Sequence, residues 1–233
     1  MPVYSQFMRT LFVAAAVSFV VVSTAGAAIV PYTEHFNADA ANWYNATSTA
    51  TVDWESTGGP DGSGHVSTTY DPSGAVEGNT PVLFRAQDEF GSSGNAFVGD
   101  YIAEGVTQFS AWVRHDASVP LNFFVRFSTP ISFPGAVAVD FTPVQPNQWT
   151  LISFSIDAAN PQFVSFEGSN FNAVFSNVGH IQAGPSIPAE LAGTTDLVTI
   201  DFDEVSITPE PASALYVGAI AIAAGVRRRR RGA

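Results

Sequence analysis

The chain has 233 residues and carries 21 acidic side chains against nine cationic ones, every one of them an arginine. Its formal net charge of −12 excludes nucleic acid as an expected partner, because a phosphate backbone is bound by clustered lysine and arginine. The lack of cysteine excludes disulfide bonds, thiolate metal sites and a cysteine nucleophile. A hydrophobic content of 46% argues against a disordered chain, so we expect a folded body with a sizeable core.

The first 27 residues have the three parts of a secretory signal peptide in the usual order. A cationic residue, Arg9, precedes the apolar run 11–22, and small residues follow with an Ala-x-Ala pattern that places cleavage at Ala25 and Ala27. The apolar run is shorter than the roughly 20 residues of a membrane span. A buried strand or an uncleaved anchor is the alternative, but the order of the three parts favours export.

The body, residues 28–208, contains 20 acidic residues and three arginines and is expected to form one all-β domain. Runs of alternating apolar and polar residues are frequent there, whereas helical periodicity is hard to find. Turn-forming residues separate the runs and no internal repeat is visible, which favours a β-sandwich of the jelly-roll type over a propeller or a solenoid. The clearest strand patterns cover residues 109–114, 123–128, 137–141, 149–156 and 197–203.

Aromatic residues near the start of the body are candidate sugar-binding groups. Sugars present apolar C–H faces that stack on aromatic rings, and Trp43, Tyr44 and Trp54 lie in the loop-and-strand region near the start of the body, where their rings could be exposed. The alternative is core packing, since most aromatic residues of such a chain must lie inside. For Trp112 and Trp149, which fall within strand patterns, we expect the core.

Both ends of the body carry recognisable segments. It begins with 32–36 (Tyr-Thr-Glu-His-Phe) and ends with 200–207 (Ile-Asp-Phe-Asp-Glu-Val-Ser-Ile), with the glycine-rich loop 59–64 and a strand starting at Trp149 between them. This order resembles that of galactose-binding-like jelly rolls, the scaffold of many carbohydrate-binding modules. The resemblance spans most of the body, and it implies that the first and last strands are neighbours.

The same resemblance implies a structural calcium ion beside those two strands, with Glu34, Asp61 and Asp203 at the matching positions. Calcium prefers several hard oxygen ligands, and the glycine-rich loop could turn its backbone carbonyls toward the ion. The alternative is a solvated acidic face next to an ordinary turn.

The sequence carries no catalytic signature. There is no His-Glu-x-x-His, no Gly-x-Ser-x-Gly and no phosphate-binding Gly-x-x-x-x-Gly-Lys motif. The adjacent acids Asp88-Glu89 and Asp203-Glu204 would point to opposite faces of a strand, which does not suit a shared site. We therefore expect no enzyme, although a Ser-His-Asp triad or a pair of facing carboxylates stays open, because both are recognised by geometry.

The last 25 residues, 209–233, combine three features in a fixed order. The triplet Pro209, Glu210 and Pro211 keeps the backbone extended, and an uncharged apolar segment, 212–226, follows it. This order, closed by an arginine cluster, resembles the PEP-CTERM sorting signal; a soluble helix with a basic tail is the alternative. The resemblance implies recognition by an exosortase, a membrane-embedded cysteine transpeptidase, with the apolar segment as a short transmembrane helix that anchors the chain transiently. The implied stop-transfer signal consists of Arg227, Arg228, Arg229, Arg230 and Arg231.

These patterns predict an exported cell-surface or extracellular-matrix protein whose non-catalytic β-sandwich binds polysaccharide or has a structural role. The expected partners are an exosortase, exopolysaccharide and, before processing, the membrane. Structural calcium is the expected cofactor. Two alternatives stay open: a secreted glycoside hydrolase on the same scaffold, and an adhesin that binds protein.

Overall fold

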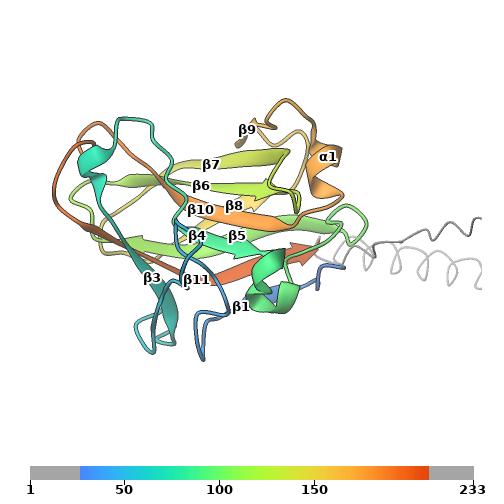
Figure 1. Cartoon of the computed structure of the whole chain (residues 1–233), viewed down its shortest axis with the longest axis horizontal. Helices are drawn as coiled ribbons and strands as arrows, with labels where there is room; N and C mark the ends of the chain where they lie inside the picture. Colours follow the sequence, from blue (N-terminus) through green and yellow to red (C-terminus); the bar gives the residue numbers. More distant parts are fainter. Residues whose placement is uncertain (1–26, 210–233) are drawn as a thin grey trace, which may run out of the picture.

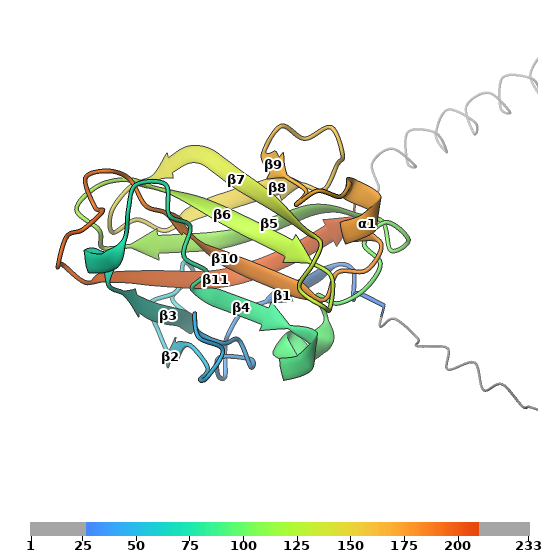
Figure 2. The same ribbon diagram turned by 45° about the horizontal axis from the view of Figure 1, so that its top comes forward.

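Two antiparallel β-sheets packed face to face make up residues 27–209, the part of the chain that the computed structural model describes (Figures 1 and 2). Sheet A has the strand order β2-β3-β11-β5-β8, and β1 also pairs with β11; sheet B has the order β4-β10-β6-β7-β9. The strands are β1 (Tyr32–Glu34), β2 (Asp53–Glu55), β3 (His65–Tyr70), β4 (Phe84–Gln87), β5 (Val106–His115), β6 (Leu121–Ser128), β7 (Gly135–Val144), β8 (Thr150–Ser155), β9 (Phe163–Ser165), β10 (His180–Ser186) and β11 (Val198–Pro209), with one short helix, α1 (Phe171–Phe175).

The expected all-β sandwich is therefore confirmed, and each of the five strand patterns coincides with a strand, namely β5, β6, β7, β8 and β11. The first and last strands are neighbours, as the resemblance implied, because Tyr32 pairs with Ile207 and Glu34 with Val205. A bulge between Asp203 and Ser206 divides β11. Before the bulge β11 pairs with β3, and after it with β1, so one edge of β11 serves two partners.

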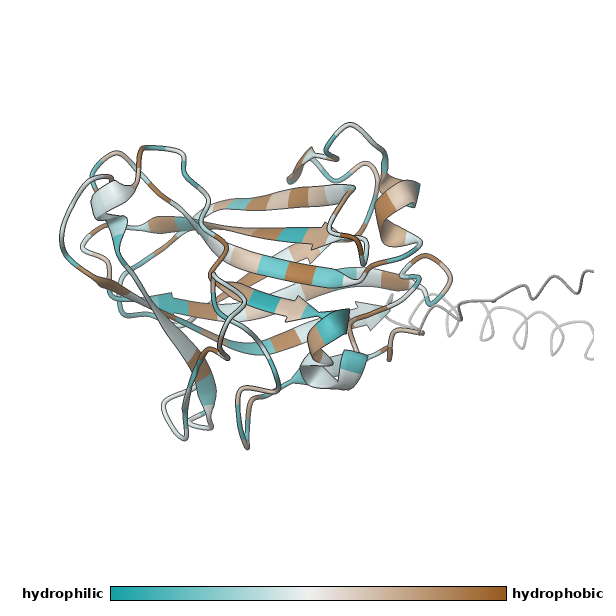
Figure 3. Cartoon of the chain, viewed as in Figure 1, coloured by the Kyte–Doolittle hydropathy of each residue, from teal (hydrophilic) through white to brown (hydrophobic). Residues whose placement is uncertain are grey.

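The core lies between the two sheets and is rich in phenylalanine. Apolar and polar residues alternate along the strands, as the banding in Figure 3 shows. Because side chains alternate across a strand, each sheet turns one apolar face inward. Phe202 of β11 stacks on Phe84 of β4 with 5.0 Å between the ring centroids, which joins sheet A to sheet B. Phe109 of β5 packs edge-on against Phe127 of β6, and this contact also joins sheet A to sheet B.

Several predicted segments lie outside the described residues. These are the signal peptide with Ala25, the motif residues Glu210 and Pro211, the apolar segment 212–226 and the arginine cluster 227–231. Pro209 is the last described residue and ends β11. Within residues 27–209, no helix combines the length and the apolar character that crossing a membrane requires.

Candidate functional site

The outer face of sheet B carries an ordered row of polar side chains. Arg85 of β4 is in register with Gln182 of β10, and Gln182 is in register with Arg126 of β6. Residues in register on neighbouring strands point to the same face, and the neighbours on either side of each of these three residues pack into the core. Three planar hydrogen-bonding groups therefore lie side by side across the sheet.

Arg126 is fixed in this row by several hydrogen bonds. Its guanidinium donates to the Gln182 amide oxygen at 2.9 Å, to the two Glu167 carboxylate oxygens at 2.5 and 2.8 Å, and to the Ser132 carbonyl oxygen at 2.6 Å. The hydrogen bonds from Arg126 lower the pKa of Glu167 and keep it ionised. Gly135 on β7 makes room, because a β-carbon there would lie 2.7 Å from the guanidinium. These hydrogen bonds thus fix Arg126 relative to Gln182 and Glu167.

A stacked pair of aromatic rings borders this row. Tyr44 lies beside β4, bridged to Arg85 through the backbone, and its ring stacks on Phe90 with 3.9 Å between the centroids and 24° between the planes. Both rings are half-buried, so part of each stays open to solvent. Of the three residues predicted to bind sugar, Tyr44 alone lies beside the polar row.

The prediction that Trp43 binds sugar is wrong. Its side chain is 0% exposed and packs edge-on against Phe36 and Phe97, while the indole N–H donates to the Ser93 hydroxyl at 2.9 Å. A ring with no exposed surface cannot stack on a ligand. Trp43 and Tyr44 are consecutive in an extended segment, so only one of them can face outward.

Trp54 lies on sheet A, in the edge strand β2, and is 37% exposed. Its indole N–H donates to the Phe36 carbonyl oxygen at 2.6 Å, which ties the ring to the backbone. The expectation that Trp112 and Trp149 lie in the core is also wrong, since both are half-buried. Trp149 instead packs under Arg114 with the guanidinium carbon 4.6 Å from the ring centroid, and it donates to the Gly58 carbonyl oxygen at 2.9 Å.

Beneath the glycine-rich loop lies a buried carboxylate with an unpartnered oxygen. Asp203 is 0% exposed, and its Oδ2 has no hydrogen-bond partner among residues 27–209. Burial, with smaller contributions from Glu204 and Asp61, raises the pKa of Asp203 to about 7. Ionised Asp203 is therefore costly unless a cation comes close.

The loop supplies oxygens at the same place. A β-carbon on Gly59 would lie 2.5 Å from Asp203 Oδ2 and 3.1 Å from the carbonyl oxygens of Ser63 and Gly64. The three oxygens thus lie close together around Gly59, and such hard donors suit calcium. Glu34 does not join them in any interaction seen within residues 27–209, since its carboxylate accepts from the Tyr32 hydroxyl and the Phe36 amide.

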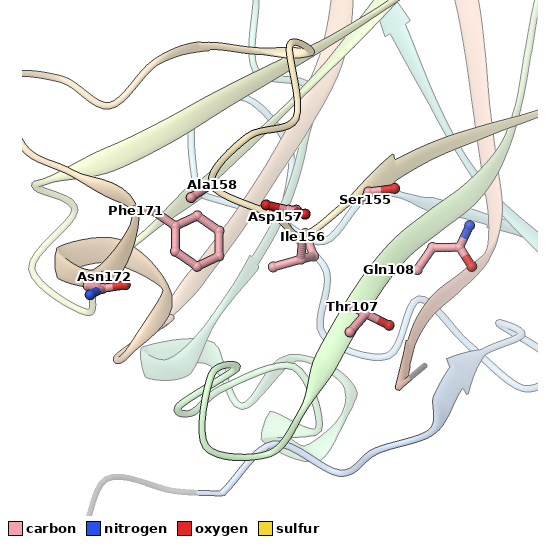
Figure 4. Close-up of a pocket in the computed structure, with 8 residues that line it drawn as sticks. All are labelled: Thr107, Gln108, Ser155, Ile156, Asp157, Ala158, Phe171 and Asn172. Atoms are coloured by element: carbon pink, nitrogen blue, oxygen red, sulfur yellow. The ribbon is translucent and has the colours of Figure 1, made fainter. Parts of the chain in front are cut away.

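A second part of the surface is hollowed. An open depression of about 570 Å³ lies where β5, the end of β8 and α1 meet, and Figure 4 shows the side chains around it. Its lining combines hydroxyl, amide and carboxylate groups with one aromatic ring, that of Phe171. The polar members are Thr107, Gln108, Ser155, Asp157 and Asn172.

The sequence alone did not predict the polar row, although the rarity of arginine in the body pointed to special roles for these residues. Arg85, Arg114 and Arg126 are the three arginines among 20 acidic residues in the body, so each is a candidate for a fixed role. Arg114 meets this expectation on sheet A, where it donates to Asp201 at 2.7 Å. Nothing in the local pattern, however, shows that Arg85 and Arg126 face the same side of one sheet.

No protein-family model matches the sequence, and no curated protein matches it. Solved structures of similar fold include the CBM22-1-GH10 modules of Clostridium thermocellum xylanase 10B complexed with xylohexaose (17% identity, 78% of this chain and 29% of that chain, TM-score 0.49). They also include an exo-β-agarase (8%, 78% and 26%, TM-score 0.50) and the CBM22-1 xylan-binding domain of Paenibacillus barcinonensis Xyn10C (14%, 79% and 97%, TM-score 0.42). The chain spans less than a third of the first two structures, and at these identities the likeness is one of fold, the β-sandwich.

Proposed function

We propose that this protein is a non-catalytic carbohydrate-binding module that holds a polysaccharide on the outer face of sheet B. One observation carries the proposal: the stacked pair Tyr44 and Phe90 borders the ordered row of Arg85, Gln182 and Arg126. Aromatic rings accept the apolar face of a sugar, and guanidinium groups hydrogen-bond its hydroxyls. The exo-β-agarase that shares the fold is in keeping with a carbohydrate ligand.

Removing the aromatic pair should weaken polysaccharide binding. We expect Tyr44→Ala and Phe90→Ala each to lower the affinity about 10- to 100-fold, because each loses about 1.5–3 kcal/mol of apolar contact. Tyr44→Phe keeps the ring and should bind nearly as well. The measurement is affinity electrophoresis of the full chain in gels that contain xylan, mixed-linkage glucan, agarose or alginate.

Phe171→Ala, in the depression of Figure 4, is the matched control and should leave the affinity unchanged. Loss of binding in this variant alone would move the ligand to that depression and contradict the proposed face. A chain that is retarded by none of the gels would contradict carbohydrate binding as a whole. Release of reducing ends from any of the polymers would favour the alternative of a glycoside hydrolase.

We further propose that calcium binds at Asp203, where it stabilises the body. Asp203 Oδ2 and the carbonyl oxygens of Ser63 and Gly64 would be its ligands, with Asp61 nearby as a further carboxylate. The ion would join the loop to β11 and neutralise the buried charge. The proposal rests on the unpartnered oxygen and on the strong net negative charge of the body, which attracts divalent cations.

Finally, we propose that the chain is exported and then processed by an exosortase at the motif Pro209, Glu210 and Pro211. The support comes from the order of the segments at the two ends of the sequence. Glu210→Ala should block processing, because it removes the charged residue of the motif. Mass spectrometry of the protein from its native host should find a mature form that lacks both end segments, and a Glu210→Ala form that keeps the arginine cluster. Recovery of the intact parent chain from the cytosol would contradict the proposal.

A further inference from the structure

Asp88, Glu89 and His180 bring three metal-ligating atoms together at one edge of the outer face of sheet B. The nitrogen Nε2 of His180 lies 3.2 Å from Asp88 Oδ1 and 2.9 Å from Glu89 Oε2. All three atoms lie within 4.8 Å of one another, and no other group of His, Asp or Glu in residues 27–209 does so. We propose that this cluster binds a divalent transition-metal ion of the zinc class.

The backbone explains why the two acids converge. Residues Asp88–Phe90 form a 3₁₀ turn directly after β4, so Asp88 and Glu89 do not alternate as they would on a strand. The expectation that these adjacent acids point apart is therefore wrong. The Asp88 amide donates to the carbonyl oxygen of Gly179 at 3.0 Å, which fixes the turn beside the residue that precedes His180.

His180 is held in place before any ion binds. It is the first residue of β10, a strand flanked by β4 and β6, where it pairs with Gln87 and Ser128. Its side chain is 2% exposed, so the packing fixes the ring. The second nitrogen, Nδ1, lies 3.2 Å from the Ser132 hydroxyl and 3.3 Å from the Gln87 amide. The Ser132 hydroxyl, or the Gln87 amide oxygen if that amide is flipped, can accept a hydrogen bond from Nδ1–H. In this tautomer Nε2 carries no proton and is free to bind a metal.

The spacing and the donor types select the kind of ion. Donors about 2.0–2.1 Å from a tetrahedral zinc ion lie roughly 3.3 Å apart, so the observed separations of 2.9 and 3.2 Å need to open by only a few tenths of an ångström. An imidazole nitrogen suits zinc and its neighbours in the transition series, whereas calcium prefers six to eight oxygens. Three protein ligands leave one position for water.

A separate observation points to the same place. The hydroxyl of Ser128 is fully buried and has no hydrogen-bond partner in the described part of the chain, and Ser128 lies directly opposite His180 in the ladder between β6 and β10. Paired residues point to the same face of a sheet, so this unsatisfied group lies on the face that carries His180. Buried polar groups are seldom left unpaired. The two carboxylates are partly exposed, which gives the ion a path from solvent.

Zinc titration of the full chain, stripped with a chelator and prepared without a histidine tag, tests the proposal. We expect one zinc ion per chain at this site, and an affinity at least 10-fold lower in Glu89→Gln and in His180→Gln. Cobalt(II) in place of zinc should give the visible absorption of a tetrahedral site, and that absorption should be lost in the same variants. Glu89 is half-exposed, so Glu89→Gln should fold even if His180→Gln does not.

Two controls separate this cluster from the oxygen site at Asp203. Glu104→Gln changes an exposed acid outside the cluster and should leave zinc binding unchanged. Asp203→Asn should also bind the zinc ion, whereas Glu89→Gln should still be stabilised by calcium. Absence of zinc binding in the parent chain, or binding that survives both Glu89→Gln and His180→Gln, would overturn the proposal and leave His180 as a hydrogen-bonded structural residue.

Discussion

Trp43→Ala should lower the free energy of unfolding by about 3–5 kcal/mol, the range for removing a large aromatic side chain from a core. Trp43 has no exposed surface, and its ring lies 5.6–5.9 Å from the rings of Phe36, Phe97 and Phe202. The substitution would empty this space and leave the Ser93 hydroxyl without the donor that it now has at 2.9 Å. Urea unfolding of the full chain, followed by circular dichroism, measures the change.

Trp54→Ala provides the matched comparison. Its ring is 37% exposed and lies on the edge strand β2, so we expect a loss of only about 1–2 kcal/mol. If Trp43→Ala abolished polysaccharide binding while unfolding at the urea concentration of the parent chain, the buried position of Trp43 would be contradicted. The comparison therefore separates a residue that stabilises the core from one that contacts a ligand.

The strands that the sequence predicted are those with an unbroken alternation of apolar and polar residues. In β8, Ile152 and Phe154 face the core while Ser153 and Ser155 face outward, and a period of two is a direct consequence of strand geometry. Strand β10 was missed because its second half reads Gly184-Pro185-Ser186, which is typical of a turn. It is nevertheless an inner strand of sheet B, paired with both β4 and β6.

The candidate sites were harder to predict because they depend on contacts between distant segments. Whether Trp43 or Tyr44 faces the core is decided by the sheet beside which the segment lies, not by the two residue types. Likewise, Asp88 and His180 are 92 positions apart, and only the pairing of β4 with β10 brings them together. By contrast, a resemblance spanning the body identified Asp203 and the loop 59–64, which do lie close together.

Asp201 and Asp203 show how neighbouring carboxylates acquire opposite roles. Both lie on the outer face of β11, two positions apart. Burial opposes ionisation of Asp201, but hydrogen bonds from His65, Arg114 and Ser67 outweigh it and lower its pKa. Within residues 27–209, Asp203 has a single backbone donor, the Glu204 amide at 2.7 Å, and burial raises its pKa to about 7. Asp201 is thus already neutralised by protein groups, whereas Asp203 needs a proton or a cation.

Without calcium, the contribution of Asp203 to stability should therefore fall as the pH rises. The folded state keeps the Asp203 proton up to a pH of about 7, whereas the unfolded chain loses it near 3.8, so the folded state binds more protons between these values. The contribution is complete below pH 4 and is lost as the pH passes 7, with a total of up to about 4 kcal/mol. In a chelator at pH 8, Asp203→Asn should be the more stable chain, because an amide carries no charge to bury.

Calcium should reduce this stability difference, and the reduction is the decisive result. At 100 times its dissociation constant, calcium should stabilise the parent chain by about 2.7 kcal/mol and leave Asp203→Asn unchanged. Asp201→Asn is the matched control: it should destabilise the fold at pH 8 with or without calcium, because Arg114 loses its partner. Urea unfolding between pH 4 and 8, in chelator and in calcium, gives all of these values.

If the stability difference between the parent chain and Asp203→Asn did not vary with pH in chelator, the buried and unpartnered state of this carboxylate would be refuted. If that difference varied with pH but calcium had no effect, the carboxylate would be buried as described and the cation site would be refuted, since only an ion bound at Asp203 links the two measurements.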